Sequence, residues 1–94
     1  MDRTRIKGIL VEEQYPEFMI ESTIDKIEKF TPAVKTVFKE WYSRNEEPDF
    51  SVNGFSFCDL VKKWGMKPVG AFITLDWLLR EPESAKNALT KGIK

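Results

Sequence analysis

The segment that most constrains the fold is residues 68–80, PVGAFITLDWLLR, because it is apolar on most sides of a helix. Placed at about 100° per residue, its large apolar side chains form two stripes. The first stripe consists of Phe72, Leu75 and Leu79, and the second consists of Val69, Ile73 and Trp77. Such a helix is either the buried centre of its domain or part of a contact surface, and central burial is the simpler interpretation.

The second stripe, Val69, Ile73 and Trp77, is the candidate partner-binding site. Asp76 and Arg80 lie between the two stripes at the helical spacing of an ion pair. An exposed apolar patch with an aromatic anchor is typical of a protein interface. If the second stripe is partly exposed, it is therefore expected to bind another protein or a second copy of this chain.

Residues 17–30 and 32–45 each carry an amphipathic helical pattern, and Thr31 and Pro32 fit the start of the second helix. Two such helices in direct succession predict an antiparallel helical hairpin with the apolar faces together. Residues 1–15 are expected to form a loose N-terminal arm or a short first helix, since Gly8 weakens a helix by roughly 1 kcal/mol relative to Ala.

The dipeptide Asn53-Gly54 is favoured in two-residue β-hairpin turns, because both positions tolerate a positive φ. Such a turn would place Val52 opposite Phe55. The alternative is a plain loop that lodges its Phe side chains in the core. We therefore predict a mainly α fold: one domain, residues 1–94, of four to five short helices around one core, with a short β-hairpin or loop around residues 50–57.

Residues 57–80 form two predicted helices that meet near Gly65, with apolar Leu60 and Met66 around the turn. This arrangement resembles the helix-turn-helix motif of DNA-binding proteins, and it implies an alternative function as a DNA-binding regulator. The sequence departs from the motif at a position that is normally small and at two that are normally bulky and aliphatic. These positions hold Val61, and Ala71 and Thr74, respectively.

The positions that would face the DNA groove are mostly apolar and include one carboxylate: Lys67, Pro68, Val69, Phe72, Ile73 and Asp76. Base edges are read mainly by Arg, Lys, Asn, Gln and Ser or Thr, and a carboxylate is repelled by phosphate. Three lysines near the turn are the candidate phosphate contacts of this alternative: Lys62, Lys63 and Lys67. DNA binding is therefore the less favoured of the two functions.

The residues that usually carry catalysis are scarce, so we expect no enzyme activity. The chain has no histidine, which removes the commonest general base and most metal sites. The single cysteine, Cys58, has no histidine to activate it, although the first turn of a helix would lower its pKa somewhat. The acidic pairs 12–13 and 46–47 lie in polar stretches. We expect no cofactor and no bound metal.

Composition bounds the remaining possibilities. The chain has 94 residues with 15 basic and 15 acidic side chains, so its net charge of zero argues mildly against nucleic acid or a membrane surface as partner. One cysteine suits a reducing compartment, and we expect a cytoplasmic location. The predicted function is a small non-catalytic adaptor or accessory module that binds a protein or its own copy, of a size that would suit a phage or mobile-element protein.

Overall fold

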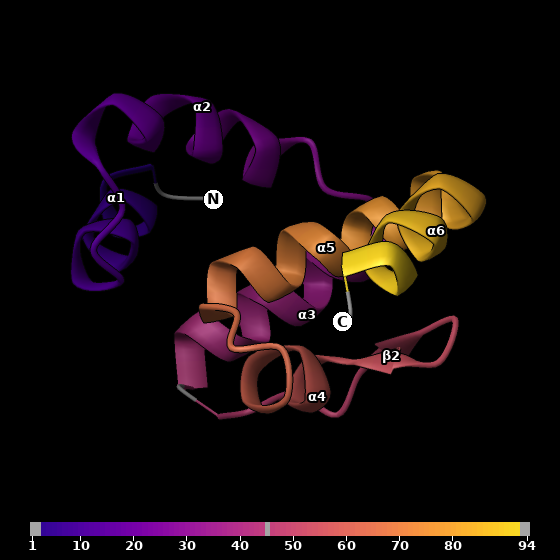
Figure 1. Cartoon of the computed structure of the whole chain (residues 1–94). Coiled ribbons are helices and arrows are strands. Elements are labelled where there is room, and N and C mark those ends of the chain that lie inside the picture. Colours follow the sequence, from indigo (N-terminus) through magenta and orange to yellow (C-terminus); the bar gives the residue numbers. More distant parts are fainter. Residues whose placement is uncertain (1–2, 45, 93–94) are drawn as a thin grey trace.

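The computed structural model, shown in Figure 1, describes residues 3–44 and 46–92. The described residues form helices and one short antiparallel sheet of two strands. In chain order, the elements are α1 (Arg3–Glu12), α2 (Glu17–Glu28), α3 (Pro32–Arg44), β1 (Ser51–Val52), β2 (Phe55–Ser56), α4 (Phe57–Lys62), α5 (Pro68–Arg80) and α6 (Pro82–Gly92). The predicted mainly α fold class is confirmed.

Helix α5 is the centre of the fold and crosses the middle of Figure 1, in orange. It packs against α3, α4, α6 and β1. Phe72 is fully buried, and its ring lies 5.2 Å from the ring of Phe38 on α3 and 4.8 Å from the ring of Phe57 on α4, measured between centroids. Central burial of residues 68–80 is therefore the correct interpretation for most of this helix.

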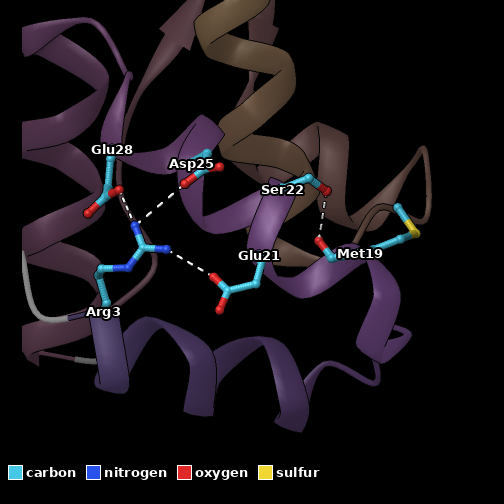
Figure 2. A network of polar contacts seen from close by, with 6 residues as sticks. All are labelled: Arg3, Met19, Glu21, Ser22, Asp25 and Glu28. Atoms are coloured by element: carbon cyan, nitrogen blue, oxygen red, sulfur yellow. Dashed lines mark hydrogen bonds and ion pairs between the residues drawn. The ribbon is translucent and has the colours of Figure 1, made fainter.

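The N-terminal segment is not a loose arm, because residues 3–12 form α1 and bring the number of described helices to six. Ile6 and Leu10 of α1 are fully buried, and α1 packs against α2. Figure 2 shows that Arg3 lies among three carboxylates of α2, from Glu21, Asp25 and Glu28. These contacts stabilise a helix whose intrinsic propensity is weakened by Gly8.

The expected hairpin of α2 and α3 is not the main packing unit. Instead, α2 packs mainly against α1, and α3 packs mainly against α5. The aromatic side chains of α3 explain this choice, because Phe38 and Trp41 both contact the Phe72 ring of α5. Aromatic pairs of this kind add stability beyond the area they bury.

Residues 51–56 form the predicted β-hairpin rather than a plain loop. Val52 pairs with Phe55, and the turn residues Asn53 and Gly54 have φ of 51° and 86°, as a type I′ turn requires. The Asn53 side-chain amide donates a hydrogen bond of 3.2 Å to the carbonyl of Leu78 on α5. An isolated two-stranded ribbon is marginal, and this contact with α5 supports it.

The turn between α1 and α2 covers the start of α5. The Val69 backbone N–H, which has no partner within its own helix, donates to Glu13 Oε1 at 3.2 Å. The ammonium of Lys67 lies 5.3 Å from the centre of the Tyr15 ring. Burial raises the pKa of the Glu13 carboxyl above its usual 4.5, although the bond from Val69 and the charge of Lys67 oppose this shift.

We predict that Glu13 makes the stability of the fold depend on pH. A carboxyl group with a raised folded pKa stabilises the fold fully below the unfolded pKa, near 4.5, and this contribution is lost as pH rises through the folded pKa. Glu13→Gln keeps an acceptor for Val69 but does not titrate. Urea unfolding from about pH 4 to about pH 7 should therefore show the wild-type chain losing stability relative to Glu13→Gln.

The comparison variant is Glu12→Gln, which makes the same charge change at an exposed neighbour. Because the Glu12 charge itself helps to raise the Glu13 pKa, we expect Glu12→Gln to reduce the pH dependence only in part, whereas Glu13→Gln removes it. Parallel curves for the wild-type chain and Glu13→Gln would contradict the prediction.

Candidate docking cleft

A cleft of about 380 Å³ opens between the C-terminal end of α2 and the outer face of α5. Two of the three residues predicted to bind a partner, Ile73 and Trp77, line it. The full lining consists of Lys26, Lys29, Phe30, Ile73, Thr74, Asp76, Trp77 and Arg80. The cleft therefore combines an apolar wall with charged groups.

The apolar wall comes from two helices. Ile73 and Trp77 are four residues apart on α5, so they lie on one face of it. Trp77 keeps 37% of its surface exposed, whereas Phe30, just after α2, is buried against Phe38 with ring centroids 5.8 Å apart. The indole of Trp77 is thus the accessible aromatic surface of the cleft.

The buried carboxylate of Asp76 joins the α2–α3 corner to α5. Its Oδ1 accepts hydrogen bonds from the backbone N–H of Thr31 at 2.7 Å and from the Thr31 hydroxyl at 3.0 Å. Its Oδ2 accepts from Arg80 Nε at 2.9 Å. A buried charge is tolerated where it is paired and hydrogen-bonded in this way.

The cleft carries an excess of positive charge. Its lining has three cations, Lys26, Lys29 and Arg80, against one carboxylate, Asp76. Arg80 neutralises Asp76, so Lys26 and Lys29 supply the excess. Within residues 3–44 and 46–92, no carboxylate lies within ion-pair distance of either lysine. The arrangement favours an anionic group placed beside an apolar one.

The third predicted partner-binding residue, Val69, is fully buried and does not belong to the cleft. It lies in the first turn of α5, which the α1–α2 turn covers through Glu13. The stripe of Val69, Ile73 and Trp77 therefore runs from the core to the surface, and only its C-terminal part is accessible.

The three lysines of the DNA-binding alternative lie elsewhere, around the N-terminal end of α5. Lys62 and Lys63 are exposed, but each has its ammonium 3.8 Å from a carboxylate, that of Glu47 and Asp59, respectively. Lys67 covers the Tyr15 ring. Phosphate binding favours a basic face that is free of acidic side chains. Because carboxylates accompany Lys62 and Lys63, these lysines do not form such a face.

The predicted groove-reading face of α5 is largely inside the protein. Val69 and Phe72 are fully buried, and Asp76 is occupied by Thr31 and Arg80. A recognition helix must present its side chains to the major groove. The structure thus offers no such face on α5 within the described chain.

Cys58 is half-buried in α4 beside Glu47 and Lys62. Hydrogen bonding to Glu47 raises the pKa of the Cys58 thiol, and desolvation acts in the same direction. The expectation that its place in the first helical turn lowers this pKa is wrong: the Glu47 carboxylate and desolvation raise the pKa, and the opposing effect of Lys62 is smaller. A raised pKa disfavours the thiolate that a nucleophile needs.

The sequence did not reveal Lys26, Lys29 and Phe30 as part of a site. The helical pattern of residues 17–30 places Lys29 on the solvent side, but periodicity does not show which helix lies next to it. The Thr31–Asp76 contact, which joins residues 45 positions apart, makes that neighbour α5. In the sequence, the charged pair of Asp76 and Arg80 within an otherwise apolar helix was the one sign of a polar contact at this point on α5.

Comparisons with models of protein families, with curated proteins and with solved structures found no match to this chain. In the described part of the chain, no helix is long and apolar enough to cross a membrane. The same residues contain no group of three or more His, Cys, Asp or Glu side chains that could hold a metal ion.

We predict that Asp76→Ala destabilises the fold by about 2–4 kcal/mol, because it leaves the Thr31 donors and Arg80 without their acceptor. Asp76→Asn keeps an acceptor for Thr31, so a smaller loss is expected. Urea unfolding of the purified variants measures both effects.

Asp59→Ala is the control, since it breaks an exposed ion pair with Lys63 at the same helical spacing. We expect it to cost about 0.5 kcal/mol. If Asp76→Ala cost no more than Asp59→Ala, the carboxylate of Asp76 would not have the structural role described.

Proposed function

We propose that this chain is a non-catalytic protein–protein interaction module, an adaptor or accessory protein, whose docking site is the cleft between α2 and α5. The observation that carries the proposal is the partly exposed indole of Trp77 in a cleft with surplus lysine charge. Aromatic and arginine side chains in pockets supply much of the energy of protein interfaces. Both are present here, as Trp77 and Arg80.

The chemistry of the cleft favours a particular ligand class: a large apolar side chain with carboxylates beside it. The apolar side chain would pack on Ile73 and Trp77, and the carboxylates would pair with Lys26 and Lys29. The volume of about 380 Å³ falls within the range of about 300–1,000 Å³ typical of ligand pockets.

Two further observations support this choice. Burial of Val69 and Phe72 favours a protein partner over DNA, because the face of α5 needed for base reading is covered. The single cysteine suits a reducing compartment, and we propose the cytoplasm. An accessory role in a phage or mobile element remains part of the proposal on grounds of size alone.

Selection from a random-peptide display library tests the proposed ligand class. We expect the wild-type chain to enrich peptides with an aromatic or aliphatic residue next to Asp or Glu. The Lys26→Glu/Lys29→Glu variant should bind these peptides at least about tenfold more weakly, since it reverses the charge at the cleft.

The matched control is Lys62→Glu/Lys63→Glu, which makes the same charge change at the exposed lysines of α4. We expect its affinity to stay within about twofold of wild type. Enriched peptides without carboxylates, or equal losses in both variants, would reject the cleft as the docking site.

A further inference from the structure

We propose that the occupant of the cleft is a second copy of this chain, which inserts Phe18 from its own α2, in a reciprocal pair. This inference rests on the docking site of the proposed function and names its partner. The first observation is the exposure of Phe18, which keeps 85% of its surface in contact with solvent. It is the most exposed of the large hydrophobic side chains of the described chain.

The position of Phe18 on α2 explains this exposure. Ile20, Ile24 and Ile27 are buried and define the inner face of the helix. At about 100° per residue, Phe18 lies roughly opposite this face. Neither α1 nor α5 therefore covers it, so the Phe18 ring is available for contact with another molecule.

The surroundings of Phe18 match the ligand class that the cleft favours. Glu17 precedes it, and Glu21 and Asp25 follow on the next turns of α2. Arg3 is the only cation among the residues labelled in Figure 2, and it faces three carboxylates there. Phe18 is thus an apolar side chain beside an acidic ridge, complementary to the surplus lysine charge of the cleft.

Both halves of the contact lie on the same helix. Phe18 is near the start of α2, and Lys26 and Lys29 are near its end, about 12 Å and 16 Å further along the axis at 1.5 Å per residue. If two α2 helices run antiparallel, the Phe18 end of each lies beside the lysine end of the other. Ser22, midway between Phe18 and Lys26, is exposed and small enough for close approach.

A two-fold arrangement of this kind forms two identical contacts at once and leaves no further binding site open. A head-to-tail arrangement would use one contact per neighbour and continue into longer chains. Because Phe18 and the two lysines lie on the same helix, one antiparallel pairing of two α2 helices can form both contacts, which favours the two-fold dimer. Each copy then buries its own Phe18 in the partner copy and its own cleft beneath the Phe18 of that copy.

Sedimentation equilibrium of the full chain from about 1 µM to about 1 mM tests the pair. We expect a monomer–dimer equilibrium with no larger species, and weaker dimerisation at high salt because the contact includes exposed charges. Phe18→Ser and Lys26→Glu/Lys29→Glu should each raise the dissociation constant at least about tenfold. Circular dichroism verifies that both variants remain folded.

The matched control is Val11→Ser. It removes another exposed apolar side chain, 57% exposed, from α1, the helix that packs against α2. We expect its dissociation constant to stay within about twofold of wild type. Mixing Phe18→Ser with Lys26→Glu/Lys29→Glu should restore part of the dimer, since one intact Phe18 then meets one intact cleft.

A monomer at all concentrations, an equal loss in Val11→Ser, or growth beyond the dimer would overturn the reciprocal pair. Peptide binding to the Phe18→Ser chain distinguishes rejection of the reciprocal pair from rejection of the proposed docking site. The cleft of this variant is intact, and no second copy occupies it. If Phe18→Ser binds selected acidic peptides while the wild-type chain is monomeric, only the second copy is rejected. If no acidic peptide binds Phe18→Ser, the docking cleft itself is rejected.

Discussion

The carboxylate of Asp76 is the contact on which the arrangement of α2, α3 and α5 depends. It is buried in the central helix, and its oxygens accept from the Thr31 backbone, the Thr31 hydroxyl and the Arg80 guanidinium. A buried carboxylate without these partners would be strongly unfavourable, so Thr31 must lie at this point on α5. Because Lys26, Lys29 and Phe30 come just before Thr31, this one contact also forms the cleft.

The remaining architecture follows from the apolar character of α5. Phe72 gathers aromatic rings from α3 and α4, and the β-hairpin is held against α5 through Asn53. The first turn of α5 is covered from the α1–α2 turn by Glu13. Only the C-terminal part of its outer face, around Trp77, remains open to solvent, and this exposure is what gives a buried central helix a surface for binding.

Helical periodicity and turn chemistry predicted much of this fold. The pattern of residues 68–80 indicated central burial, and Asn53-Gly54 indicated the hairpin. The same pattern could not separate Val69 from Trp77, because the cover over Val69 comes from residues more than fifty positions earlier in the chain. The N-terminal helix was uncertain for the same reason, since the carboxylates that hold Arg3 belong to α2. Ile73 and Trp77 were predicted from the sequence to bind a partner. Lys26 and Lys29 could not be assigned to the same site from the sequence, because the tertiary contact between Thr31 and Asp76 is what brings them to α5.

The measurement that tests the cleft most directly is an amide and indole N–H spectrum of the isotope-labelled Phe18→Ser chain, whose cleft no second copy occupies, with and without an acidic peptide that contains Phe. We expect the Trp77 indole resonance and the backbone resonances of residues 26–30 and 73–80 to shift together. Resonances of residues 57–67, which include the lysines of α4, should stay in place. Shifts centred on residues 57–67, or an unchanged Trp77 indole at saturation, would contradict the assignment of the docking site.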